Sequence, residues 1–315
     1  MTSRHRSAKK EWPALTYGEW SDTVATLHMW TQIVGKIRLA HSPWTNHSWH
    51  VPLYLTARGM TTSLIPYGGA AFEIIFDFVA HQLIIQTASG EQRFIPLEPV
   101  SVADFYKATL EHLDDLNLST AIHTTPSEIA EGIPFDEDAT HCSYDQEYVS
   151  RFWQALIQVD RVFKEFRARF IGKCSPVHFF WGSFDLAVTR FSGKEAPPHP
   201  GGVPNFPDWV AREAYSHEVS SAGFWPGGGG VDNAAFYSYA YPMSDGFSNA
   251  KVVPKGAAWS ANLGEFLLPY DEVRTSSAPD ETLLDFLQST YEAAADLAQW
   301  ERAELERNFE QAPGG

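Results

Sequence analysis

The sequence predicts an α+β fold of two diverged tandem-repeat halves, each made of a helix, an antiparallel meander and a second helix, packed around a shared cleft. Two internal echoes support this prediction. In the first, a Gly-Lys pair and a Ser-Pro pair precede a tryptophan and an arginine that enclose an apolar segment, in Trp49–Arg58 and again in Trp181–Arg190. In the second, Phe94-Ile-Pro-Leu and Phe266-Leu-Leu-Pro each lead into a helical pattern. Since related halves commonly form a cleft where they meet, we expect a ligand site between them.

The first half is predicted to span residues 19–120. Apolar residues at helical intervals predict a helix over Trp20–Leu39. Ser101 is a suitable N-cap for a closing helix that ends near Leu116. Between the helices, short apolar segments separated by turn residues predict the strands of a meander, at 51–57, 61–66, 72–78, 82–87 and 93–95.

The second half is predicted to span residues 121–307. It opens with a helix over Gln146–Ile171 and closes with one over Glu281–Arg307. Two irregular insertions lengthen it: the proline-rich Glu195–Pro207, expected to form an ordered loop or a lid, and the glycine run that follows Trp225-Pro226. Strands are expected between the helices at 178–180, 184–191, 218–224 and 235–241.

Composition restricts the class of protein and its partners. With 44% hydrophobic and 14% aromatic residues, the 315-residue chain carries enough apolar surface to order a core. A formal charge of −16 repels phosphate backbones and anionic lipid, so we expect neither nucleic acid nor a membrane as a partner. Two distant cysteines and the absence of a signal-like or spanning apolar run favour the cytoplasm. Residues 1–18, with a basic run, and 308–315 are expected to be mobile tails.

Three segments carry a resemblance to a known family: Asn46–Tyr54, Ser175–Gly193 and His217–Gly227. On these segments the chain resembles a bacterial family labelled domain of unknown function 5996, over about residues 12–297. The resemblance implies no activity and supplies no catalytic residues. The candidate sites below therefore rest on the chemistry of the residues.

The candidate catalytic residues are histidines and carboxylates of the second half: His178, His217, Glu218 and Asp185. Asp185 lies on an apolar strand and needs a partner, because an unpaired buried charge is costly. In the functional interpretation, Asp185 orients a histidine as general base, while Arg58 and Arg190 hold an anionic substrate group. In the structural interpretation, Asp185 pairs with an arginine or a histidine as a strut between sheet and helix.

The histidines also raise the question of a metal. Neutral imidazoles suit zinc, iron or copper, so His50, His178 and His217 could hold a divalent metal; the sequence identifies no other cofactor. The spacing gives little support, since no His-Glu-x-x-His pattern occurs. Hydrogen-bonded structural histidines are the alternative.

Aromatic residues could line a pocket for a ring-containing ligand: Trp49, Trp181, Trp225 and Tyr239. Tyr237, Tyr239 and Tyr241 alternate along one strand, so their side chains share a face of the sheet. That face borders a cleft in the functional interpretation. In the structural one, bulky aromatics simply cover a sheet.

These observations predict an enzyme that acts on a small organic metabolite, anionic or ring-containing, by acid and base chemistry, with metal assistance as an option. The alternative is a non-catalytic module that binds or senses a small ligand, and a third possibility is an interface for a protein partner. A histidine that reaches Asp185 or Glu218 and faces open space would favour the enzyme. An aromatic cleft without such a pair would favour binding. The sequence leaves the oligomeric state open.

Overall fold

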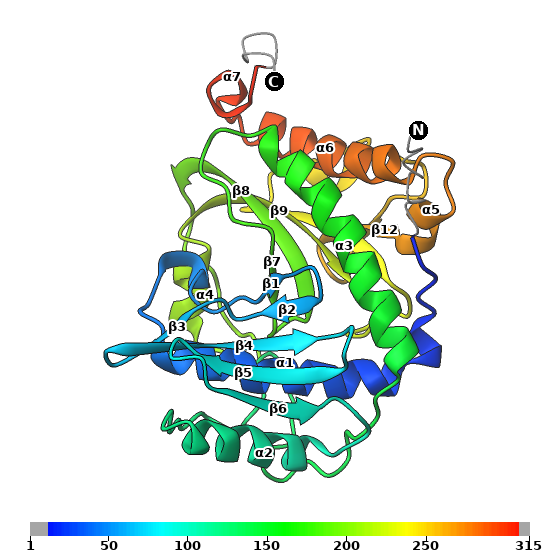
Figure 1. The fold of residues 1–315 in the computed structure, drawn as a ribbon. Coiled ribbons are helices and arrows are strands. Elements are labelled where there is room, and N and C mark those ends of the chain that lie inside the picture. Colours follow the sequence, from blue (N-terminus) through cyan, green and yellow to red (C-terminus); the bar gives the residue numbers. More distant parts are fainter. Residues whose placement is uncertain (1–11, 309–315) are drawn as a thin grey trace, which may run out of the picture.

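Two antiparallel sheets, each accompanied by helices, make up the computed structural model, which describes residues 12–308 (Figure 1). This arrangement confirms the α+β class that the sequence predicts. No helix in the described range is long and apolar enough to cross a membrane.

The first sheet follows helix α1 (Ser21–His41) and precedes helix α2 (Val102–Asp115), whose N-cap is Ser101 as predicted. Its strand order is β1-β2-β4-β5-β6, and β3 pairs with β4. The structure divides the second predicted strand in two and shortens the first. The strands are β1 (Tyr54–Leu55), β2 (Gly59–Thr61), β3 (Ile65–Tyr67), β4 (Ala70–Asp77), β5 (Gln82–Thr87) and β6 (Gln92–Pro96).

The second sheet has the order β11-β12-β10-β9-β8-β7. It contains β7 (His178–Phe180), β8 (Asp185–Glu195), β9 (His217–Trp225), β10 (Ala235–Tyr241), β11 (Ala258–Ser260) and β12 (Glu265–Pro269). The α-helices of this half are α3 (Gln146–Ala168), α4 (Asp208–Ala214), α5 (Tyr270–Arg274), α6 (Pro279–Leu297) and α7 (Arg302–Leu305). The predicted closing helix is therefore interrupted after Leu297, and the sequence pattern did not predict α4, α5, β11 or β12.

The two faces of the second sheet have different neighbours, because side chains alternate along each strand. On β8, Arg190 points to the helical side and lies over the rings of Phe166 in α3 and Tyr291 in α6. Asp185 and Thr189 point to the opposite side, toward segments contributed partly by the first half. The open face of this sheet therefore supplies the floor of a site between the halves.

Helix α1 is buried on almost every side because it lies between the halves. Trp30 stacks on Phe105 of α2, with ring centroids 4.6 Å apart. On another side, the indole of Trp181 lies against Gly35, where a Cβ atom would overlap the ring. This close approach fixes Trp181 relative to the first half.

The tandem duplication is not confirmed. Both halves contain a helix, a six-stranded antiparallel sheet and a later helix, and Phe94 and Phe266 lie on the strand that comes last along the chain in each sheet. However, Trp49 precedes β1, whereas Trp181 follows β7. The tryptophan echo therefore does not mark equivalent positions.

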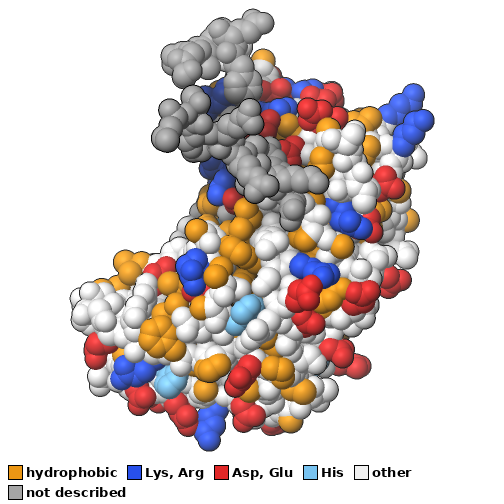
Figure 2. All heavy atoms as spheres, turned by 45° about the vertical axis from the view of Figure 1, so that its right-hand side comes forward, with side chains coloured by type: hydrophobic (Ala, Val, Ile, Leu, Met, Phe, Trp, Pro, Cys, Tyr) orange, Lys and Arg blue, Asp and Glu red, His pale blue; other side chains and the backbone are white. Residues whose placement is uncertain are grey.

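The expected N-terminal tail is only partly covered by the structure. Trp12 and Leu15 are buried, and the Tyr270 hydroxyl donates to the carbonyl of Pro13 at 2.9 Å, so residues 12–18 pack against the body. Residues 1–11, with the basic run, and 309–315 lie outside the described residues. On the face shown in Figure 2, acidic, basic and hydrophobic side chains are interspersed.

Candidate functional site

A cavity of about 430 Å³ lies over the open face of the second sheet. Strands β7 to β10 form its floor, and the first-half segment 44–51 forms one wall. The loop at Ser127 and Glu128 and a covering segment, residues 199–215, which includes α4, complete the lining. A volume of this size suits a small organic ligand.

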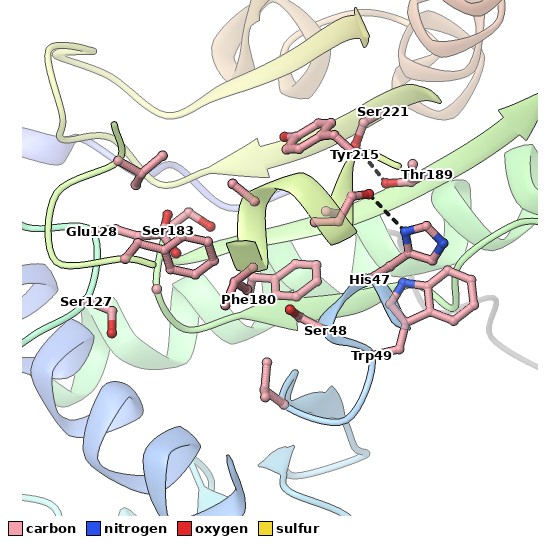
Figure 3. A pocket seen from close by; sticks show the side chains of 18 of the residues that line it. His47, Ser48, Trp49, Ser127, Glu128, Phe180, Ser183, Thr189, Tyr215 and Ser221 are labelled. Atoms are coloured by element: carbon pink, nitrogen blue, oxygen red, sulfur yellow. Dashed lines mark hydrogen bonds between the residues drawn. The ribbon is translucent and has the colours of Figure 1, made fainter. Parts of the chain in front are cut away.

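The polar groups gather at two ends of the cavity. Figure 3 shows Glu128 and Ser183 side by side at one end and His47 beside Trp49 at the other, with the ring of Phe180 between them. The walls are otherwise mainly apolar and aromatic. This gives the cavity an acidic end and an indole-imidazole end.

Glycine at position 223 allows a tyrosine to reach across the floor. Tyr237 on β10 pairs with Gly223 on β9, which in turn pairs with Ala187 on β8. The phenol lies over Gly223, and its hydroxyl donates to Oδ2 of Asp185. Ser183 donates to the other carboxylate oxygen, Oδ1. Asp185 is therefore partnered by two hydroxyl groups.

Glu128 is presented to the cavity by a strained backbone. Its φ of 64° lies in the left-handed region, which costs a residue other than glycine about 1 kcal/mol or more. Its N–H donates to the carbonyl of Pro204 at 2.9 Å. Gln32 of α1 holds the preceding residue, since its side chain donates to the carbonyl of Ser127 at 3.0 Å and accepts from the N–H at 2.7 Å.

The Glu128 carboxyl makes no hydrogen bond within the described residues, and it packs over Gly182. Burial, and then the charge of Asp185, raise its pKa to about 7. Burial likewise raises the pKa of Asp185 to about 6, although its two hydroxyl partners oppose the shift. On β12, burial and Asp185 raise the pKa of Glu265 to about 8. The two carboxyl groups at the acidic end of the cavity, Glu128 and Asp185, therefore have pKa values close to neutral pH.

His47 at the opposite end is a neutral imidazole in a fixed orientation. Nδ1 donates to the carbonyl of Ala214 at 2.9 Å, and Nε2 accepts from Nζ of Lys173 at 2.6 Å. Burial lowers the His47 pKa, and the Lys173 charge lowers it further. The Lys173 ammonium lies 4.9 Å from the ring centre of Phe191 and 5.5 Å from that of Trp49.

His178 lines the cavity but is a poor general base at neutral pH. The residue is 1% exposed, and burial lowers its pKa to about 3. Its Nδ1 atom has no hydrogen-bond partner in the described part of the chain. The imidazole is therefore uncharged.

Five of the predicted site residues line the cavity: His178, Asp185, Trp49, Trp181 and Tyr239. The indole of Trp181 donates to the carbonyl of Val51 at 2.9 Å. The Tyr239 hydroxyl lies 2.8 Å from that of Tyr215, which comes from the covering segment.

The structure does not bring together the two arginines of the predicted clamp. Arg58 lies before β2, pairs with Asp77 at 2.7 Å and is not among the residues that line the cavity. Arg190 is fully buried on the other face of the sheet and donates to the carbonyl of Phe166. Each guanidinium is held by its own half of the chain, so the two do not converge.

The remaining predicted site residues also lie outside the cavity lining. Glu218 accepts from Ser192 at 2.8 Å, and Trp225 packs on Tyr237 with ring centroids 4.5 Å apart. His217 contacts Ser216, and Nδ1 of His50 accepts from the N–H of Thr45 at 3.1 Å. Within residues 12–308, no three histidine, cysteine or acidic side chains are placed to hold a metal ion. His50, His178 and His217 are therefore not assembled into the predicted metal site.

Glu128 was not predicted as a site residue because the segment around it, between α2 and α3, has no periodic pattern of apolar residues. Only the tertiary contacts with α1 and Pro204 direct it into the cavity. Tyr237 could be found, since its alternation with Tyr239 placed both on one face of the sheet.

Comparison with known proteins gives a family and no more. The model described as "Family of unknown function (DUF5996)" matches residues 12–307, nearly the whole chain, which confirms the resemblance found in the sequence. No curated protein and no solved structure matches the chain.

Proposed function

The chain belongs to DUF5996, a family of unknown function, and from its cavity we propose that it binds a small organic molecule. One observation carries this proposal: a partly open, mainly apolar and aromatic cavity of about 430 Å³ into which a strained backbone presents the carboxyl of Glu128, which has no hydrogen-bond partner within the described residues. A buried acid without a partner is costly to keep. A ligand group would satisfy it.

Binding is favoured over histidine-based catalysis by the partners of the carboxylates. Asp185 is bonded to hydroxyl groups and Glu218 to Ser192, and neither is bonded to a histidine among the described residues. The aromatic cleft without such a pair is the arrangement that the sequence associated with a binding or sensing module.

An acid-base enzyme is the second candidate, supported by the coupled carboxyls of Glu128 and Asp185. A group whose pKa lies near 7 can both donate and accept a proton at neutral pH, as Glu128 would. In this version Glu128 transfers the proton, and Asp185, held by Tyr237, raises its pKa. His217 and Glu218 have no part in it.

The proposal is tested by screening a metabolite library against purified protein by thermal shift. Ala187→Phe, which fills the cavity from its floor, should abolish every hit of the wild-type protein. The matched control is Ala70→Phe, the same substitution at an exposed position of β4, which should keep the hits. Hits that survive Ala187→Phe would contradict the proposal.

The same hits separate binding from catalysis. Each is incubated with the wild-type protein and analysed by mass spectrometry and NMR. Recovery of the unchanged compound supports binding. A product whose formation depends on Glu128 would establish the second candidate.

The cytoplasmic location and the common origin of the halves remain proposals. The free Cys142 and Cys174 support the first, since neither forms a disulfide. Cell fractionation tests it. The shared element order supports the second, and superposition of the two sheets with their helices tests it.

A further inference from the structure

We propose that the ligand is an organic amine, bound as its ammonium form, with the charged head at Glu128 and an apolar or aromatic body against the walls of the cavity. This inference rests on the proposed function and specifies the chemical class of the ligand.

The charges around the cavity favour a cation. Its lining contains the carboxyl groups of Glu128 and Asp185, and no lysine or arginine among the described residues lines it. Glu265 adds a third acidic group close to Asp185. An anionic ligand would bring a further negative charge into this region, whereas an ammonium group would offset the repulsion that is already there.

Two basic side chains that adjoin residues of the lining are engaged elsewhere. Lys173 donates to His47 at the end opposite Glu128. Arg38 donates to the carbonyl of Pro52 and lies over the ring of Tyr54. The histidines of the lining do not compensate, because burial lowers the pKa of His47 and His178, as it does that of His199.

The hydrogen-bonding state of the acids points to the same ligand. Both oxygens of Asp185 accept from hydroxyl groups, so this carboxyl needs no further donor. Glu128 accepts from no group in the described chain and faces the cavity. A primary ammonium group carries three hydrogen-bond donors, and one of them would give the Glu128 carboxyl a hydrogen-bond partner. Ser183 lies beside Glu128 in Figure 3, and its hydroxyl oxygen, whose hydrogen is donated to Asp185, is available to accept from another.

The aromatic walls suit the rest of such a molecule. Phe180 lies between the acidic end and Trp49 (Figure 3), so a body extending from Glu128 would pass its ring. Aromatic faces attract cations as well as apolar groups. At the rim, Trp44 and Trp209 pack with ring centroids 4.6 Å apart, and the indole of Trp44 donates to Glu213. The enclosure therefore combines one acidic point with an extended apolar surface.

The test compares three probes of the same size: 3-phenylpropylamine, 3-phenylpropan-1-ol and 3-phenylpropanoate. Their affinities for the wild-type protein are measured at pH 7.5 by calorimetry and by tryptophan fluorescence. We expect the amine to bind about 10- to 100-fold more tightly than the alcohol, and the carboxylate to bind most weakly, because one charge-assisted hydrogen bond accounts for the difference. Glu128→Gln should lower the affinity for the amine to that for the alcohol. Glu98→Gln, at an exposed position, should change nothing.

Equal affinities of the wild-type protein for amine and alcohol would overturn the inference. The proposed function would not be contradicted by that result, because both compounds would still bind. Tighter binding of the carboxylate, or no binding of the amine at millimolar concentration, would overturn it as well. The proposed function is judged separately by the Ala187→Phe screen. The comparison within the wild-type protein does not depend on the folding of any variant.

Discussion

Replacing Gly223 with alanine is predicted to displace Tyr237 from Asp185. A Cβ atom at position 223 would overlap the phenol carbon and hydroxyl oxygen of Tyr237. The ring must move by about 1 Å to restore ordinary contact. Because the phenol spans from β10 to β8, a shift of this size breaks its hydrogen bond to Asp185. It also disturbs the packing of Tyr237 on Trp225.

The magnitude follows from these two contacts. A hydrogen bond to an ionised carboxyl contributes about 1.5 to 3 kcal/mol, and an aromatic pair about 0.5 to 1.5 kcal/mol. Alanine restricts the unfolded chain and restores up to about 1 kcal/mol. We therefore expect Gly223→Ala to lower the free energy of unfolding by about 1 to 4 kcal/mol at pH 8.

Urea unfolding measures this change against two other variants. Gly69→Ala is the matched control, since a Cβ atom there meets nothing within 4 Å. Tyr237→Phe removes only the hydroxyl group. The double variant Gly223→Ala, Tyr237→Phe should lose less stability than the sum of the losses in the two single variants, because both substitutions remove the same hydrogen bond. Full additivity, or a Gly223→Ala protein as stable as the Gly69→Ala protein, would refute the reasoning.

Three further substitutions have definite expected outcomes. Burial raises the pKa of Glu128 from 4.5 to about 7, so between these pH values the folded chain holds a proton that the unfolded chain has lost, and stability falls as pH rises. Glu128→Gln should therefore be about 3 kcal/mol more stable than wild type at pH 8 and lose this advantage near pH 4.5. Urea unfolding at a series of pH values measures the difference, and a difference that does not change with pH would contradict the prediction. Arg190→Met should leave the melting temperature unchanged or higher, because two nitrogens of this buried guanidinium lack hydrogen bonds; a large loss of stability would mean that its contacts with the aromatic rings outweigh its burial. Gly35→Ala, normally favourable in a helix, should instead cost about 1 to 3 kcal/mol by urea unfolding, because Trp181 occupies the space of the methyl group; a gain in stability would show that the indole moves freely.

Periodicity predicted the helices and strands that have one apolar face. The helix expected over Trp20–Leu39 appears at Ser21–His41, and the strand expected over 235–241 appears at the same residues. These elements can be predicted from the sequence because the spacing of side chains along a helix or a strand is a local property. The same local rule placed Tyr237 and Tyr239 together, and both take part in the cavity floor or its hydrogen bonds.

Arg190 shows where that rule stops. Alternation along β8 correctly separates Asp185 from Arg190, but it does not say which face covers a ligand and which packs on helices. That choice depends on α3 and α6, whose rings of Phe166 and Tyr291 surround the guanidinium. The sequence analysis therefore predicted a substrate-binding role for Arg190, whose contacts in the structure are with the helices.

The sequence by itself determined the α+β class, the main helices and strands, the acidic charge and the family, because these depend on composition, on spacing along one segment and on matching motifs. Only the tertiary structure decided which polar residues meet. Glu128 enters the cavity because Gln32 and Pro204, distant in sequence, hold its loop, and Tyr237 reaches Asp185 because Gly223 leaves room on the strand between them. Such meetings depend on how separate segments pack, and no spacing along the chain encodes them.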